Sequence, residues 1–247
     1  MGWPSGYGRR VLAEVDSTNA EAARIAGGLS GPEWILGLRQ TAARGRRGRA
    51  WVNPAGNFAG TLVLRPDETA DKLALRSFVA SLALYDALAS VSGTEAGLAL
   101  KWPNDVLLNG GKLAGILLEG IGGPGGHLAI GIGVNLLAAP GREAVEAGAV
   151  APVSLLEETG VRVLPEVFLD ALAEAYAVQE ERFVTYGFDP IRSLWLSRAA
   201  RLGEVIVART SRESTTGVFE TVDGAGQLVL KTPKGRVTIA AADIFFE

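Results

Sequence analysis

The hydrophobic pattern of this chain changes once, near residue 200, and that change restricts the folds open to it. Before Gly203, segments with helical periodicity alternate with short apolar runs, which predicts a mixed α/β domain. After Gly203, short β-rich runs alternate with turn residues such as Asp223-Gly224, which predicts a small antiparallel barrel or sandwich. We therefore expect an α/β (α+β) chain with two domains, at residues 1–200 and 201–247.

Two segments of the larger domain have clear local signals. Apolar residues recur at helical spacing from Leu75 to Leu88, so a helix is predicted over 72–91. Two apolar runs, 106–108 and 113–119, flank Asn109-Gly110, a dipeptide typical of a β-hairpin. The other predicted strands cover 10–14, 34–39, 58–64, 98–101, 127–136, 205–208, 216–222, 228–231 and 237–240, and the other predicted helices cover 20–26, 153–158, 165–186 and 191–198.

The composition excludes several kinds of chemistry. The 247 residues include no cysteine, which rules out disulfides, zinc–thiolate sites and a catalytic thiol. The one histidine, His127, follows the glycine-rich segment 122–126, which we interpret as a hairpin turn and a poor place to hold a general base. No apolar run reaches membrane-spanning length and no signal-peptide pattern opens the chain, so we expect a cytoplasmic protein with no membrane partner.

The segment Arg44–Arg49 reads Arg-Gly-Arg-Arg-Gly-Arg and is the strongest functional signal. Guanidinium groups this close repel one another unless they face solvent or surround a polyanion, and their shape matches phosphate and carboxylate. Because the formal net charge of the chain is -3, the positive charge is local and favours a bounded anionic ligand. An RNA-binding segment remains an alternative. However, only one aromatic residue, Trp51, closely follows the segment, whereas nucleic-acid binding usually needs repeated aromatic side chains on which bases stack. We expect the loop to be mobile without its ligand.

Three further segments add polar groups. Asp16-Ser17-Thr18-Asn19 is, taken alone, typical of a helix N-terminus. Lys101-Trp102-Pro103-Asn104-Asp105 places a lysine, an amide and a carboxylate between two strands, where they need partners or belong to an ordinary surface turn. Lys112 begins the apolar strand Leu113–Glu119, as a strand-end charge or as a charge directed at a ligand. Gly131 and Gly133 alternate along the next strand and leave one face open to close approach.

These segments, in this order and at these separations, resemble those of the biotin protein ligases. The resemblance extends from Asp16 to the C-terminal barrel and rests on Arg-Gly-Arg-Arg-Gly-Arg, Lys-Trp-Pro-Asn-Asp and Lys-Leu-Ala-Gly-Ile-Leu. It implies a class-II-synthetase-like mixed sheet with flanking helices, followed by an SH3-like barrel. It also implies a two-step reaction in which biotin and ATP, with Mg²⁺, give biotinyl-5′-AMP, and the biotinyl group then passes to a lysine of a biotin carboxyl carrier protein domain of a biotin-dependent carboxylase.

The same resemblance implies roles for individual residues. Lys112, Arg46 and Asp105 would be catalytic, with Asp105 as a magnesium ligand or as the group that orients the incoming lysine. The residues implied to bind biotin are Ser17, Thr18, Asn19, Gln40, Arg44, Arg46, Lys112, Gly115 and Ile116. The residues implied to bind ATP or the adenylate are Arg46, Arg49, Trp51, Asn104, Lys112 and Asn135.

The chain also differs from the biotin protein ligases in some respects, and other functions fit parts of its sequence. The segment 243–247 lacks an arginine that some relatives use near the nucleotide, which leaves the part of the C-terminal domain in ATP binding open. The catalytic pattern begins by Asp16, with no winged helix-turn-helix ahead of it, so we expect no specific DNA binding. As a separate prediction, we expect a monomer or weak homodimer. A lipoate–protein ligase is the nearest alternative, and a basic-loop nucleic-acid-binding module is an alternative from another class.

Overall fold

A seven-stranded mixed sheet forms the centre of the larger part of the chain. The structure is a computed structural model that describes residues 2–123, 125–142, 145–146, 148–210 and 212–246. The strands run in the spatial order β1-β2-β3-β7-β6-β5-β4, and only β1 and β2 pair in parallel. Their bounds are β1 Gly8–Leu12, β2 Glu33–Gly37, β3 Phe58–Leu64, β4 Leu98–Lys101, β5 Asp105–Leu108, β6 Gly111–Ile121 and β7 His127–Val134. The predicted mixed α/β fold is confirmed.

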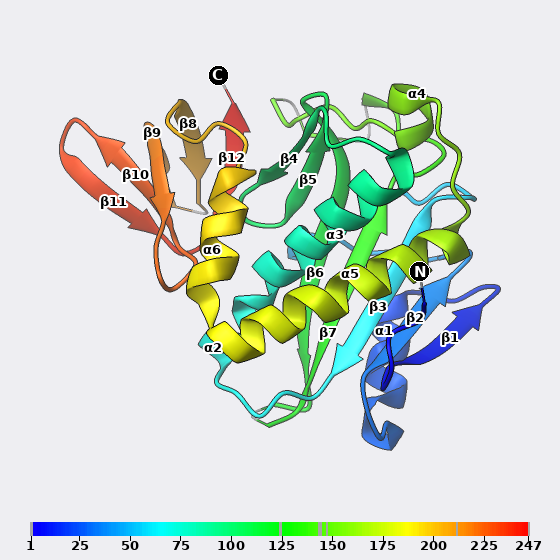
Figure 1. Ribbon diagram of the computed structural model, residues 1–247. Helices are drawn as coiled ribbons and strands as arrows, with labels where there is room; N and C mark the ends of the chain where they lie inside the picture. The colour runs from blue at the N-terminus through cyan, green and yellow to red at the C-terminus, as the bar shows by residue number, and fades with distance from the viewer. Residues whose placement is uncertain (1, 124, 143–144, 147, 211, 247) are drawn as a thin grey trace.

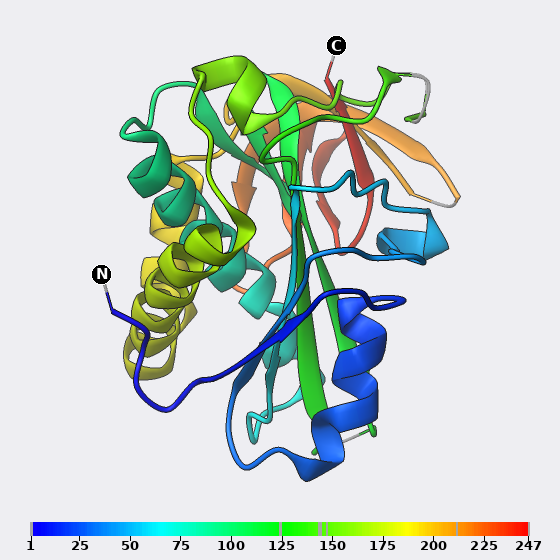
Figure 2. The same cartoon turned by 90° about the vertical axis from the view of Figure 1, so that its right-hand side faces the viewer.

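Helices cover the two faces of this sheet unequally. The long helices α3 (Arg76–Ser92) and α5 (Pro165–Tyr186) pack together on one face, whereas α1 (Thr18–Ile25) lies on the other face (Figures 1 and 2). The predicted helix over 72–91 is present as two elements, because α2 precedes α3. The shorter helices are α2 Ala70–Ala74, α4 Leu155–Thr159 and α6 Phe188–Ser197, with 3-10 turns at η1 Ala26–Gly28 and η2 Arg46–Gly48.

Aromatic contacts join the helical layer to the sheet. Phe58 of β3 meets Phe168 of α5 edge-on with ring centroids 5.0 Å apart, and Trp34 of β2 meets Tyr176 of α5 at 6.0 Å. The segment Ala70–Ser92 has the length and hydropathy of a membrane span, contrary to the expectation that no run would. However, 67% of its apolar window is buried inside the fold, as in the core helix of a globular domain.

The C-terminal segment forms a separate five-stranded antiparallel sheet in the order β11-β10-β9-β8-β12. Its strands are β8 Val205–Arg209, β9 Ser214–Val222, β10 Leu228–Thr232, β11 Gly235–Ile239 and β12 Asp243–Phe246. The first four match the predicted β-rich runs, whereas β12 is an element that the sequence pattern did not indicate. The division of the chain into domains at residue 200 stays a prediction.

Two tryptophans attach the C-terminal sheet to the rest of the molecule. Trp195 of α6 packs between Phe78 of α3, at 5.3 Å between ring centroids, and Phe219 of β9, at 6.5 Å. Its indole N–H donates to the Ser81 hydroxyl at 3.1 Å. The indole N–H of Trp102 donates to the Gly226 carbonyl at 3.1 Å. Aromatic packing and a hydrogen bond therefore hold the C-terminal sheet beside the rest of the molecule (Figure 1).

Replacing Trp195 with alanine should lower the free energy of unfolding by about 3–5 kcal/mol, because it empties a site where the side chain is only 1% exposed. Urea denaturation followed by circular dichroism measures the change. Val184→Ala is the matched control, since Val184 is 66% exposed and should change stability by less than about 0.5 kcal/mol. Equal losses in both variants would show that Trp195 does not hold the two sheets together.

Candidate active site

The arginine-rich segment forms a tight turn that closes on itself. The amide of Gly45 donates to the Arg49 carbonyl at 2.7 Å, and the amide of Trp51 donates to the Ala43 carbonyl at 3.0 Å. Arg47 and Gly48 adopt left-handed backbone conformations at φ 57° and 72°, and glycine accepts this geometry without a steric cost. The loop therefore has a defined hydrogen-bonded shape, and it lies on the same side of the sheet as α1 (Figure 2).

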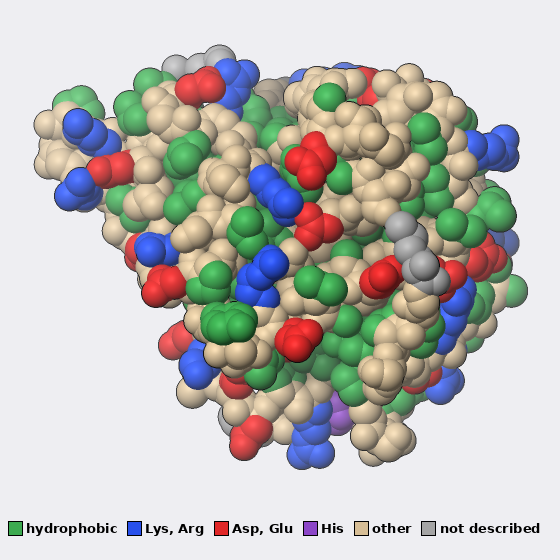
Figure 3. Space-filling view, in the orientation of Figure 1, with side chains coloured by type: hydrophobic (Ala, Val, Ile, Leu, Met, Phe, Trp, Pro, Cys, Tyr) green, Lys and Arg blue, Asp and Glu red, His purple; other side chains and the backbone are tan. Residues whose placement is uncertain are grey.

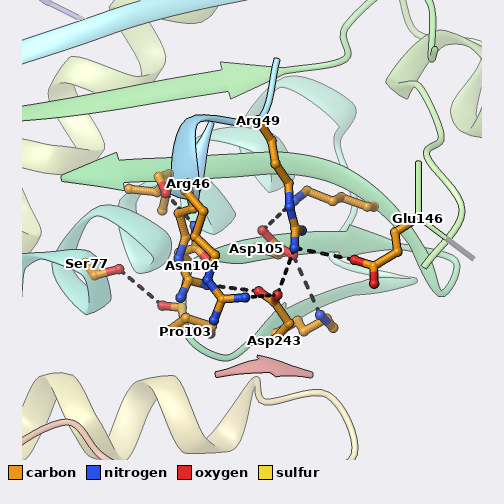
Figure 4. Close-up of polar contacts among 12 residues, drawn as sticks. Arg46, Arg49, Ser77, Pro103, Asn104, Asp105, Glu146 and Asp243 are labelled. Carbon is orange, nitrogen blue, oxygen red and sulfur yellow. Dashed lines mark hydrogen bonds and ion pairs between the residues drawn. The ribbon is translucent and has the colours of Figure 1, made fainter. Parts of the chain in front are cut away.

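The motif Lys-Trp-Pro-Asn-Asp forms the turn from β4 to β5 and meets this loop. Asn104 is held from two sides, since its amide donates to the Ile116 carbonyl at 2.5 Å and its oxygen accepts from Arg46 at 3.2 Å. The same motif is fixed from behind by Ser77 of α3, whose hydroxyl donates to the Pro103 carbonyl at 3.1 Å (Figure 4). The interpretation of this motif as a surface turn is wrong, because Lys101 and Trp102 are buried.

Asp105 lies between two lysines from separate strands. Its Oδ1 is 2.7 Å from the Lys112 ammonium on β6, and its Oδ2 is 3.7 Å from the Lys101 ammonium on β4. Burial alone would raise the pKa of the Asp105 carboxyl, but the charges of Lys112 and Lys101 together hold it below its ordinary value. Asp105 is therefore ionised at neutral pH and orients the Lys112 side chain, which is 29% exposed.

Burial affects two other cations of the site. It lowers the pKa of the Lys101 ammonium, and the nearby Lys112 charge adds to this shift while Asp105 opposes it. It also lowers the pKa of the Arg46 guanidinium, against the attraction of Asp243 and Asp105. A guanidinium stays protonated through such a shift. An anion that enters the site would relieve the repulsion among these groups, so the arrangement favours binding of negative charge.

A buried polar cluster occupies the end of the site near α1. The amide and hydroxyl of Thr18 donate to the Gln40 side-chain oxygen at 2.8 and 3.2 Å. Thr61 of β3 donates to the Asn19 side-chain oxygen at 2.6 Å and lies 2.8 Å from the Thr18 hydroxyl. The sequence analysis missed Thr61, although it is the only hydroxyl in an otherwise apolar buried strand. The Ser17 hydroxyl makes no capping hydrogen bond, so the segment is not simply a helix cap.

Glycines on β6 and β7 form the floor of the site. Gly115 and Gly133 face each other across the two strands, and the Trp51 ring lies on them. A Cβ atom at Gly133 would come within 2.6 Å of that ring, and a Cβ at Gly131 would collide with the Asn19 side chain. The predicted open face is therefore covered in this structure by Asn19 and Trp51.

One cavity of about 270 Å³ brings these elements together. All of the site residues that the sequence predicted line it, namely Ser17, Thr18, Asn19, Gln40, Arg44, Arg46, Arg49, Trp51, Asn104, Asp105, Lys112, Gly115, Ile116 and Asn135. Two carboxylates that the sequence did not indicate, Asp243 of β12 and Glu146, also line it. The single histidine, His127, lies at the start of β7 and borders a different hollow.

Among the residues that the structure describes, two polar side-chain atoms of the cavity wall have no hydrogen-bond partner. Asn135 is 2% exposed and its amide donates to the Val153 carbonyl at 3.0 Å, but its side-chain oxygen accepts no hydrogen bond. The indole nitrogen of Trp51 is likewise buried without an acceptor. Buried polar atoms without partners are costly, and at a cavity wall they suit contacts that a ligand completes.

Known protein families match both parts of this chain. Residues 12–135 match the Biotin/lipoate A/B protein ligase family, and residues 202–247 match the Biotin protein ligase C terminal domain. A biotin–[acetyl-CoA-carboxylase] ligase from Paracoccus denitrificans is 60% identical over 96% of this chain and 99% of its own length. The bifunctional ligase/repressor BirA of Bacillus subtilis is 32% identical over 95% of this chain and 73% of its own length.

Solved structures agree with the sequence relatives. The biotin protein ligase from Aquifex aeolicus in complex with biotin and ATP superposes with a TM-score of 0.81 and 26% identity, and the match covers 96% of this chain and 97% of that one. The identity to the Paracoccus protein over nearly the full length of both chains, together with the two matched domains, is sufficient to assign the family. The chain belongs to the Biotin/lipoate A/B protein ligase family.

Proposed function

We propose that this chain is a biotin–[acetyl-CoA-carboxylase] ligase. The observation that carries the proposal is the convergence of Lys112, Arg46 and a buried polar cluster on one cavity, in a chain 60% identical to a biotin–[acetyl-CoA-carboxylase] ligase. In the first step the biotin carboxylate attacks the α-phosphate of ATP, and pyrophosphate leaves. In the second step the amine of a carrier-protein lysine attacks the acyl carbon of biotinyl-5′-AMP, and AMP leaves.

Charge neutralisation is the main task of the first step. A carboxylate and a triphosphate repel each other, so fixed cations must surround the point where they join. Lys112, held by Asp105 at 2.7 Å, is placed to bridge the carboxylate and the α-phosphate. Arg44, Arg46 and Arg49 enter the same cavity from the loop and supply the positive charge for the phosphates.

The two ends of the cavity suit the two ends of the adenylate. The ureido ring of biotin carries two N–H donors and a carbonyl acceptor, which match the oxygens and hydroxyls of Ser17, Thr18 and Gln40. Gly115 and Ile116 would lie along its aliphatic tail. At the other end the unpartnered oxygen of Asn135 is suited to accept from the adenine amino group.

Magnesium enters this scheme as the counter-ion of ATP. The described residues contain no group of three or more carboxylate or histidine ligands that would hold a resident metal. Asp105 already has lysines at both of its oxygens, which favours its role as an orienting group over that of a metal ligand. Mg²⁺ commonly binds through substrate phosphates and water with few protein ligands, so the donor set suits an ion that arrives with the nucleotide.

The loop has a second task after the adenylate forms. A mixed anhydride hydrolyses if water reaches it, and a folded loop over the cavity excludes water until the carrier protein docks. We expect the acceptor to be a biotin carboxyl carrier protein domain and the reaction to take place in the cytoplasm. The absence of specific DNA binding and the monomer or weak homodimer also stay predictions.

Pyrophosphate release tests the function directly. The purified protein is supplied with Mg²⁺–ATP and either biotin or lipoate, and then with an apo carrier domain whose intact mass is followed. Biotin should support release and add one biotinyl group to the carrier, and a carrier with its target lysine replaced by arginine should stay unmodified. Preference for lipoate would instead establish the lipoate–protein ligase alternative.

The nucleic-acid-binding alternative has less support from the structure. The face formed by α5 and α6 carries interspersed positive and negative side chains (Figure 3), and Arg47 and Arg49 of the loop are already paired with Asp243. Strong, salt-dependent binding of RNA or DNA by the purified protein would favour it.

Lys112→Ala should reduce the rate of biotin-dependent pyrophosphate release by about 100-fold or more, because the two reacting anions lose the charge that bridges them. Lys112→Arg keeps the charge and should retain more activity. Lys234→Ala, in the exposed turn between β10 and β11, is the control and should match the unmodified protein. Near-normal release by Lys112→Ala would contradict the role assigned to this lysine.

Gly133→Ala should raise the KM for ATP by about tenfold, equivalent to about 1.4 kcal/mol, because the new methyl group displaces the Trp51 ring. Steady-state pyrophosphate release at saturating biotin measures it. Gly120→Ala on β6 is the control, since a Cβ there meets no atom within 4 Å. An unchanged KM in Gly133→Ala would show that the position of Trp51 does not matter to the nucleotide.

A further inference from the structure

The carboxylate of Asp243 is shared by three arginines of the loop. Its Oδ2 lies 2.6 Å from Arg47 and 3.0 Å from Arg49, and its Oδ1 lies 3.9 Å from Arg46 (Figure 4). Asp243 belongs to β12 of the C-terminal sheet, nearly 200 positions further along the chain than the loop. The Asp243 side chain is 19% exposed, whereas Arg47 and Arg49 are 42% and 55% exposed, so the carboxylate is the more buried partner of each pair.

A second carboxylate near the loop has a smaller role. Glu146 approaches only one loop arginine, Arg49, at 3.4 Å, and it lies equally far from Arg209 of β8. Its side chain is 45% exposed. Asp243 therefore pairs with more of the loop arginines than Glu146 does.

Arg47 differs from the other arginines of the loop. Arg44, Arg46 and Arg49 line the cavity, but Arg47, which the structure also describes, does not. Arg47 has a left-handed backbone conformation, and its guanidinium donates to the Asp243 carboxylate at 2.6 Å. Arg47 is thus placed to fasten the loop rather than to contact phosphate.

The strand that carries Asp243 is itself held in place. Asp243 pairs with Arg209 across β12 and β8, so its backbone position is set by the sheet. Further along β12, the Phe246 ring lies 5.6 Å from the Lys101 ammonium and 5.3 Å from the Arg201 guanidinium. The carboxylate is therefore presented to the loop from a fixed element.

We propose that Asp243 is a positioning residue for the adenylation reaction. The C-terminal sheet supplies this carboxylate, which holds the arginine loop in its closed shape through Arg47 before ATP binds. This inference rests on the proposed function for its effect on ATP, but not for its effect on the loop. With the loop already ordered, the triphosphate meets Arg44, Arg46 and Arg49 without first overcoming their mutual repulsion and the ordering entropy. The C-terminal sheet thereby contributes to nucleotide use through a carboxylate and not through an arginine.

Limited trypsin digestion of the protein without substrates tests the loop directly, because trypsin cleaves after arginine and each fragment is assigned by mass. Asp243→Asn removes the charge but keeps the shape, and cleavage within 44–49 should become at least about fivefold faster. Asp243→Glu should restore part of the protection. Glu220→Gln is the matched control, since it breaks the Glu220–Arg236 pair of the same sheet away from the loop and should not change cleavage there.

Two further measurements separate a positioning role from a loss of folding. Arg47→Ala leaves the C-terminal sheet untouched and should also speed cleavage after the remaining loop arginines. The double variant with Asp243→Asn should be no faster than Asp243→Asn alone, because that single variant already removes the Arg47 pair. In biotin-dependent pyrophosphate release, Asp243→Asn should raise the KM for ATP about fivefold while kcat changes less than twofold, whereas a loss of folded protein would lower kcat and leave KM unchanged.

Distinct results would overturn the proposal. An unchanged rate of loop cleavage in Asp243→Asn and Arg47→Ala would show that the loop does not depend on this pair. A lower KM for ATP in Asp243→Asn would show that the carboxylate competes with phosphate instead of preparing its site. If the protein releases no pyrophosphate with biotin, the proposed function fails, whereas the digestion result still decides whether Asp243 orders the loop.

Discussion

The active site depends on a balance of charge. Its lysines and arginines suit anionic substrates, and carboxylates hold these cations in position before a substrate binds. Lysines and arginines placed this close would repel one another in an empty cavity. The fold answers with two acidic side chains: Asp105 stands between Lys101 and Lys112, and Asp243 stands against the arginine loop. Each carboxylate is carried by the first residue of a strand, β5 or β12, so its position is set by a sheet. The substrates then enter a site whose geometry is already fixed, which is the condition for electrostatic stabilisation of a transition state.

Glycines of the central sheet also shape the cavity, because they leave space above the backbone of β6 and β7. At the paired positions Gly115 and Gly133, the absence of side chains lets the Trp51 ring rest directly on the backbone. That ring connects the end of the arginine loop to the strand that carries Lys112, whose ammonium lies 5.7 Å from it. Movement of the loop therefore alters the environment of Lys112, which couples the position of the loop to the part that we propose for this lysine.

Local sequence signals predicted much of the fold, and the resemblance to the biotin protein ligases predicted the membership of the site. The bounds of β3, β4 and α5 agree with the predicted ranges, because each has a continuous apolar or periodic pattern between strong turn residues. The site residues that the resemblance implied share one cavity, whereas each motif taken alone also fitted a helix cap, a surface turn or a strand-end charge. In contrast, β12 was missed because a strand of four residues at the edge of a small sheet has too little pattern to detect.

Contacts between distant segments account for what sequence reasoning could not supply. Thr61 and Asp243 are unremarkable in their own segments, and they acquire importance only when α1 and the loop are packed against them. The arginine-rich segment illustrates the point from the other side. Its composition predicted a mobile loop awaiting a polyanion, but the structure shows a carboxylate from the opposite end of the chain already paired with it. The excess of arginines over those that line the cavity is then explained, because Arg47 fastens the loop through which the other arginines reach the substrate.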